Sequence, residues 1–223
     1  MTFCRPLIIA SSVLFSVATV QADTHAANQN DQIREYRAAL RAVNPEYVAG
    51  GGRFEMVLDG DQLHIAMTVE NLTPQMMHMQ HLHGSRDGMG ASCPPLSREA
   101  LNGEPVDLID SRRYSGITLV PLHDDPASLK IQSDSYPETD KVGGYTYSQK
   151  VSWKALQQAV KKEYGLSELE LSDLVVYIHG VPQDTDLPDS TGSLDGVPAH
   201  LTLPVACGEV EEWNPQEGAG LIE

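Results

Sequence analysis

Two runs of alternating apolar residues, separated by a tight turn, restrict the fold of this chain more than any other feature. The apolar positions are Phe54, Met56, Leu58, Leu63, Ile65, Met67 and Val69. A period of two residues is typical of a β-strand that buries one face. Asp-Gly-Asp at residues 59–61 lies between the two runs, and this arrangement predicts a β-hairpin.

Other segments predict further strands and two helices. We expect strands at residues 73–84, 116–123, 172–180 and 199–210, helices at residues 31–47 and 152–165, and long loops at residues 84–115 and 124–144. The first helix is predicted from apolar residues at helical spacing, namely Ile33, Tyr36, Leu40 and Val43. Short strands joined by long loops are typical of a mainly β protein, here a β-sandwich or barrel with added helices.

The first 22 residues have the pattern of a secretory signal peptide. Arg5 precedes an apolar run, and small residues end the segment at Ala22. We expect cleavage after Ala22 and a periplasmic or secreted product. The apolar run is too short for a membrane anchor. We assign residues 23–50 to an N-terminal helical extension, residues 51–210 to the β-sandwich domain and residues 211–223 to an acidic C-terminal tail.

Removal of the signal peptide leaves two cysteines, Cys93 and Cys207, in a compartment where disulfides persist. A bridge between them would stabilise the fold by about 4–5 kcal/mol in the chain-entropy model, because the loop that it closes is long. Two free, buried thiols are the alternative.

The chain is acidic, which excludes some classes of partner. It has 31 Asp and Glu residues against 15 Lys and Arg residues, and its formal net charge is −16. Such a surface repels nucleic acid and anionic lipid, and no basic stripe in the sequence offsets this repulsion. We therefore expect no nucleic-acid partner. A small anionic substrate would also be repelled unless local positive charges surround its site.

The sequence HMQHLHG at residues 78–84 places three histidines at the end of a predicted strand. Because side chains alternate faces along a strand, His81 and His83 share one face and His78 points to the other. Two imidazoles on one face can bind the same metal ion, although strand histidines also occur as plain surface residues. His179 ends a buried strand and supplies the third nitrogen that a copper or zinc site requires, with a structural role as its alternative.

These motifs resemble the copper–zinc superoxide dismutase family. The matching segments are HMQHLHG, the loop with Cys93, DLVVYIHG at residues 173–180 and PVACGEV at residues 204–210. CHRD domains, whose strand carries a similar H-x-H-G motif, are a related resemblance.

The resemblance implies a Greek-key β-sandwich or barrel of the superoxide dismutase type. It implies that one copper ion is bound by His81, His83 and His179, and that His78 is structural. It further implies a disulfide between the two mature cysteines.

The sequence departs from this family at two places. The family's zinc site needs histidines in the loop after the cysteine, but residues 94–115 contain none, and Arg98 lies near the position of the metal-bridging histidine. We therefore expect the zinc site to be lost. The family also has an arginine three positions before the late cysteine, where it attracts superoxide, and this chain has Pro204 there. The loop arginines that are candidates to replace it are Arg86, Arg98, Arg112 and Arg113.

The motifs do not identify which residue is the fourth copper ligand. His123 is the first candidate, since Asp124 follows it and a carboxylate can orient an imidazole. His200 on the predicted strand at residues 199–210 is the second candidate. Met77 and Met79 share the strand face of the two same-face histidines, and their thioethers suit Cu(I). Filling the core is the alternative role for both methionines.

Three functions are consistent with this sequence. The first is an exported copper carrier, buffer or redox protein whose partner is a copper donor or acceptor protein. The second is a copper-only superoxide dismutase, which converts superoxide to oxygen and hydrogen peroxide. The third is a CHRD-type interaction domain whose histidines bind no metal. Pro204 and the acidic composition favour the first function.

Overall fold

The structure is a computed structural model that describes Met1 and residues 33–86, 90–95, 104–132 and 134–214. The predicted signal peptide lies outside the described residues except for Met1, and so do Arg98 and most of the C-terminal tail. No helix within the described residues is long and apolar enough to cross a membrane.

The protein is mainly β, as the alternating pattern predicts. Its strands are β1 (Arg34–Ala42), β2 (Gly51–Asp59), β3 (Gln62–Glu70), β4 (Met79–Gly84), β5 (Ile117–Pro121), β6 (Tyr145–Ser152), β7 (Val175–His179), β8 (Pro204–Glu209) and β9 (Glu211–Trp213). Helices α1 (Leu108–Ser115), α2 (Trp153–Tyr164) and α3 (Ala199–Thr202) and two short 3-10 turns, η3 (Pro126–Ser128) and η4 (Leu171–Asp173), complete it.

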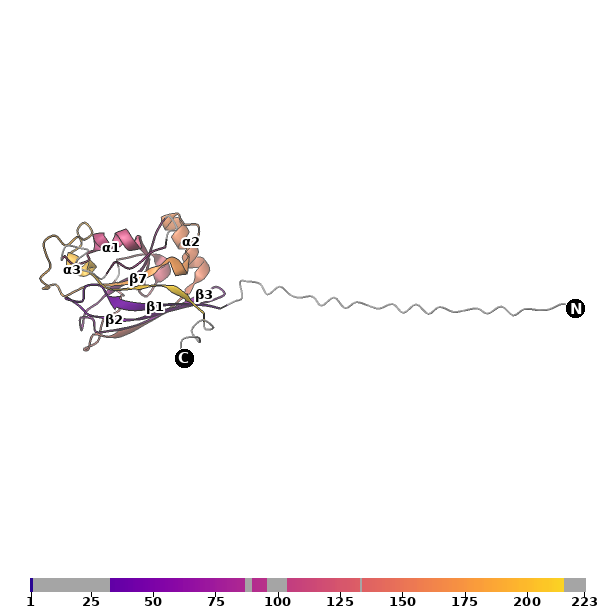
Figure 1. Cartoon of the computed structure of the whole chain (residues 1–223), viewed down its shortest axis with the longest axis horizontal. Coiled ribbons are helices and arrows are strands. Elements are labelled where there is room, and N and C mark those ends of the chain that lie inside the picture. The colour runs from indigo at the N-terminus through magenta and orange to yellow at the C-terminus, as the bar shows by residue number, and fades with distance from the viewer. Residues whose placement is uncertain (2–32, 87–89, 96–103, 133, 215–223) are drawn as a thin grey trace.

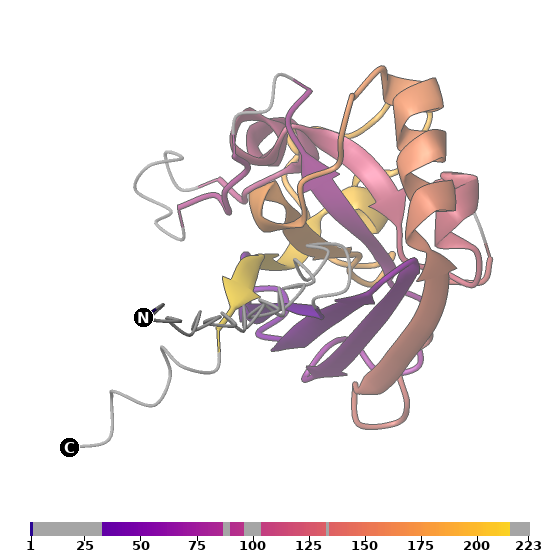
Figure 2. The ribbon, with the colours of Figure 1, turned by 90° about the vertical axis from the view of Figure 1, so that its right-hand side faces the viewer.

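All strands pair antiparallel in the order β5-β4-β7-β8-β1-β2-β3-β6, with β9 added beside β1. The sheet curls into a half-barrel, so that β1–β3 and β6 form one wall and β4, β5, β7 and β8 form the other (Figure 1 and Figure 2). Apolar side chains from both walls fill the space between them.

The predicted hairpin is confirmed. Strands β2 and β3 pair along their whole length, with Asp59 opposite Gln62 across a two-residue turn. Gly60 in this turn has φ of 55°, a left-handed conformation that glycine adopts without strain. All seven alternating apolar residues are buried, and burying each larger one contributes about 1.5–3 kcal/mol.

The predicted helix at residues 31–47 is wrong, and with it the helical extension. This segment forms β1, a strand between β2 and β8. Tyr36 and Leu40 are four residues apart, which fits both periods, and Ala38 between them is also buried. The alanine- and arginine-rich composition favours a helix, but backbone pairing on both sides outweighs that local preference.

Three further boundaries differ from prediction. The predicted loop at residues 84–115 contains α1, whose first turn is capped by the Asp107 carboxylate. The predicted strand at residues 199–210 begins with the helical turn α3, so His200 does not lie on a strand. The start of the tail forms β9, whose Trp213 contacts the Arg37 guanidinium of β1.

The predicted helix at residues 152–165 is confirmed as α2. The Ser152 side chain caps its first turn, and Gly165 ends it with a positive φ. Leu156 and Val160 are fully buried. Helix α2 contacts β5, β6 and η3, and therefore lies where the two ends of the sheet approach each other (Figure 2).

Candidate metal centre

Two neighbouring strands of one wall carry the three histidines that sequence analysis selects. His81 and His83 lie on β4, and His179 ends β7. The two strands pair directly, with His81 opposite Tyr177. An irregularity in pairing falls next to His83 on the β5 side and next to His179 on the β8 side. Such bulges redirect side chains near functional sites.

The side chains of His81, His83 and His179, called the triad below, converge. Their ring centroids lie 5.4–6.0 Å apart. One ring nitrogen from each histidine lies within 4.8 Å of one nitrogen from each of the others. All three side chains are at most 4% exposed. A buried group of three imidazole nitrogens at this spacing has the geometry of a metal site.

In each ring of the triad, one nitrogen is hydrogen-bonded and the other is free. The free atoms are Nδ1 of His81, Nδ1 of His83 and Nε2 of His179, all buried without a partner among the described residues. Buried polar atoms nearly always have partners. Three converging rings, each with one partnerless nitrogen, therefore indicate a site built for a ligand that accepts lone pairs.

For two of the three rings, the hydrogen bond at the other nitrogen fixes which nitrogen carries a lone pair. Nδ1 of His179 donates to the Thr202 carbonyl at 2.9 Å, so its Nε2 carries a lone pair. The Tyr136 hydroxyl donates to the Ile131 carbonyl, and its oxygen lies 2.8 Å from Nε2 of His81. That oxygen therefore accepts from His81, whose Nδ1 is left free.

Burial keeps the triad neutral. Desolvation lowers the pKa of His81 and His83 well below the usual value, and repulsion from the neighbouring imidazoles and, for His83, from Arg112 lowers them further. Desolvation lowers the pKa of His179 to about 4. Neutral imidazoles are the form that binds metal ions, so the triad is ready to bind one at neutral pH.

His78 lies behind the triad. Its Nδ1 is 3.1 Å from the His179 carbonyl, and its Nε2 is 3.3 Å from the Thr73 carbonyl. This buried ring thereby ties the end of β7 to the segment that precedes β4. These contacts agree with a structural role.

His123 does not join the triad. Its Nε2 donates to the Lys130 carbonyl at 2.7 Å, and its Nδ1 accepts from the Asp125 amide at 3.0 Å. Both ring nitrogens are occupied, and Tyr136, whose ring contacts both His123 and His81, lies beside the triad. Among the described residues, the group that could hold a metal ion contains the three histidines of the triad, and His123, the first candidate for a fourth ligand, is not part of it.

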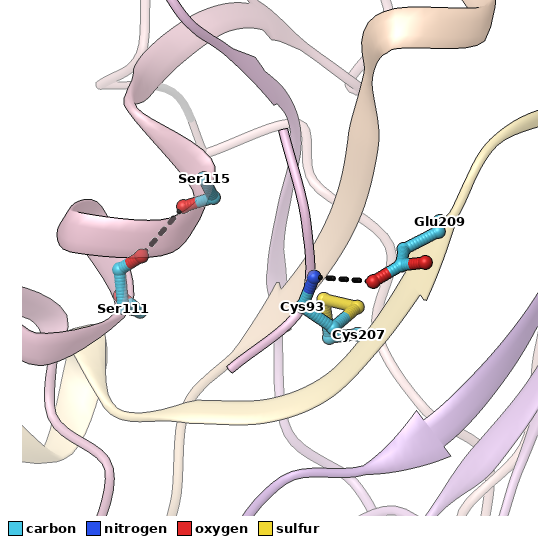
Figure 3. The surroundings of a disulfide bond; sticks show 5 residues. All are labelled: Cys93, Ser111, Ser115, Cys207 and Glu209. Carbon is cyan, nitrogen blue, oxygen red and sulfur yellow. Dashed lines mark hydrogen bonds between the residues drawn. A yellow bond between two sulfur atoms is a disulfide. The ribbon is translucent and has the colours of Figure 1, made fainter. Parts of the chain in front are cut away.

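Cys93 and Cys207 are joined by a disulfide (Figure 3). The bridge attaches the segment before α1 to β8, and the Cys93 amide also donates to the Glu209 carboxylate at 2.9 Å. Cys207 pairs across the sheet with Tyr177, whose ring lies 4.9 Å from that of His83. The disulfide is therefore one strand away from the triad.

Two residues that orient the triad could not be predicted from the histidine motifs. Tyr136 lies at His81, and the Thr118 hydroxyl lies 3.2 Å from Nε2 of His83. Both are outside the motifs, and the segment around Tyr136 has no periodic pattern. Of the loop arginines, Arg112 and Arg86 line a pocket with His83, whereas Arg113 forms an ion pair with Asp110.

The two methionines lie differently. Met79 lines a pocket of about 390 Å³ together with His81 and His179, while Met77 is exposed. Only Met79 is therefore placed near the triad.

Neither a scan of the chain against protein-family models nor a search of curated proteins gives a match.

Proposed function

We propose that this protein is an exported copper-binding protein, a carrier, buffer or redox protein, with the Greek-key fold of the superoxide dismutases. The observation that carries the proposal is the set of three buried, partnerless imidazole nitrogens. Copper would supply one-electron redox chemistry there. The chain itself supplies neutral nitrogen ligands and holds their orientation through the bonds to Tyr136 and Thr202.

A thioether beside the triad supports copper over zinc. Three imidazoles suit both metals, so the triad alone does not choose between them. The thioether of Met79 lines the pocket beside His81 and His179, and soft ligands favour Cu(I).

The strand order supports the proposed Greek-key fold. Three neighbouring pairs, β3 with β6, β4 with β7 and β1 with β8, join strands that are not consecutive in the chain. Long connections of this kind are typical of Greek keys. The signal-peptide pattern and the disulfide support an oxidising compartment outside the cytoplasm.

Superoxide dismutation is the second candidate function. The observation that favours it is Arg112, which lines a pocket with His83 and lowers the pKa of its imidazole. A cation at this point compensates for the loss of the family's arginine at position 204. Turnover of superoxide by the copper-loaded protein, lost in Arg112→Gln, is the result that would select this function.

We expect the metal-free protein to bind one equivalent of copper, and His83→Gln to weaken that binding by more than about 100-fold. Removal of a residue that hydrogen-bonds a metal ligand already lowers metal affinity by about 10–100-fold, and removal of the ligand itself lowers it further. Competition with a chelator of known affinity, performed separately for Cu(I), Cu(II) and Zn(II), measures the three affinities.

His64→Gln is the matched control for this experiment, because His64 lies on β3 outside the triad. It should retain the affinity of the unchanged protein. Equal copper affinity in the two variants, or no binding by the unchanged protein, would disprove the proposed site. Tighter binding of zinc than of both copper ions would disprove the choice of metal.

Tyr136→Phe should reduce copper affinity by about 10–100-fold without removing a ligand. The change deletes the acceptor that holds the proton on Nε2 of His81, so both ring tautomers become populated. Tyr145→Phe is the control, since that hydroxyl donates to Gln80 away from the triad. The Cu(II) electron paramagnetic resonance spectrum should change in the first variant alone; identical spectra and affinities would show that Tyr136 is not needed.

A further inference from the structure

A second pocket, of about 720 Å³, reaches the triad from the side of His83. Three cationic residues from separate segments line it: Arg86 after β4, Arg112 on α1 and Lys130 after η3. We call it the basic pocket. Its volume is in the range of sites for small organic molecules, about 300–1,000 Å³, and far exceeds what a diatomic ion fills.

The charge of the basic pocket is opposite to that of the whole chain. The chain carries a formal charge of −16, yet Glu163 is the sole acidic residue among the described residues that line this pocket. None of the ion pairs found between described residues involves the three cations. A local positive potential on an acidic protein concentrates anions at that point.

The walls between the cations are apolar and aromatic. Ile117, Leu129 and Ile131 line the pocket, and so does Tyr164, whose ring lies 5.9 Å from the Arg86 guanidinium carbon. An arginine next to an aromatic ring offers both charge and a flat apolar surface. The basic pocket therefore combines charge recognition with apolar contact.

We propose that the basic pocket binds a small organic anion, with its acidic group held by Arg112 and Arg86 and its apolar body against Ile117, Leu129 and Tyr164. Guanidinium groups bind carboxylate and phosphate oxygens in the same bidentate geometry, so the acidic group is one of these two. The site requires no metal, and its existence is independent of copper binding. It places the ligand beside His83, the one histidine of the triad that lines this pocket.

The test uses the metal-free protein at low ionic strength and isothermal titration calorimetry. The probes are benzoate, phenyl phosphate, the neutral benzyl alcohol and inorganic phosphate. We expect saturable binding of benzoate or phenyl phosphate, with benzyl alcohol and inorganic phosphate each at least tenfold weaker. The tighter of the two organic anions identifies the acidic group.

Arg112→Gln should weaken binding of the organic anion at least tenfold, whereas Arg113→Gln should leave it unchanged. Both variants remove one positive charge from α1, but Arg113 pairs with Asp110 and does not line the basic pocket. Equal weakening in both variants would show that net charge alone acts and would overturn the proposal. If benzyl alcohol bound as tightly as the organic anion, the cations would have no role in binding. If inorganic phosphate bound as tightly as the organic anion, the apolar walls would have no role. Either result would overturn the proposal. Because no metal is present, failure here leaves the copper proposal untouched.

Discussion

The double variant Cys93→Ala, Cys207→Ala should lose about 4–5 kcal/mol of unfolding free energy. The bridge joins residues 114 apart in sequence, and in the chain-entropy model a loop of that size greatly restricts the unfolded chain. The loss is large relative to the total stability of a typical domain, about 5–15 kcal/mol. Equilibrium unfolding in urea, followed by tryptophan fluorescence, measures it.

Reduction of the unchanged protein provides the matched comparison. Dithiothreitol should destabilise the unchanged protein by about the same amount and have no effect on the double variant. A reduced protein as stable as the oxidised one would mean that the unfolded chain is already compact in this region, so that the bridge restricts nothing.

Acidification from pH 7 to pH 5 should destabilise the metal-free protein by up to roughly 4 kcal/mol per pH unit. An unfolded histidine takes up a proton near pH 6.5, whereas the pKa of each buried triad histidine is lowered. Below pH 6.5 the unfolded state therefore binds more protons than the folded state. The stability of the neutral triad is complete above that pH and is lost as the pH falls toward the lowered values, at about 1.4 kcal/mol per unit for each histidine.

His83→Gln removes one of these three groups and should reduce the slope by about 1.4 kcal/mol per pH unit, while His78, whose pKa is also lowered by burial, contributes in both proteins. His64→Gln is the control, because it replaces a histidine that lies on β3 outside the triad. Urea unfolding at pH 7, 6 and 5 measures the slopes. A pH-independent stability would show that the triad takes up protons as readily in the folded state as in the unfolded state, in conflict with its burial.

Sequence reasoning succeeded where local pattern and tertiary packing agree. The hairpin of β2 and β3 has strict alternation and a two-residue turn, and α2 has a serine cap and a terminal glycine. It failed at β1, where Tyr36 and Leu40 satisfy both the helical and the strand period. Only the pairing of β1 with β2 and β8, which no local window contains, decides between the two.

The triad, too, was predictable only in those features that depend on local sequence. His81 and His83 could be assigned to one face by strand geometry, and their meeting with His179 depends on the pairing of β4 with β7. The tautomer of His81 depends on Tyr136, which is 55 residues away in sequence. His123 has an adjacent carboxylate, as a ligand often does, but backbone groups of its own loop occupy both ring nitrogens.

The position of α2 has a consequence for how this protein meets other copies of itself. Strands β5 and β6 each end the sheet, and an uncovered edge strand is a template for aggregation. Helix α2 continues directly from the end of β6 and also contacts β5, so it lies beside the edge strand β5 at the opening between the two walls. Local detachment of α2 would make the edge of β5 more accessible while the rest of the fold is intact. The principal hazard of weakening this helix is therefore intermolecular strand pairing.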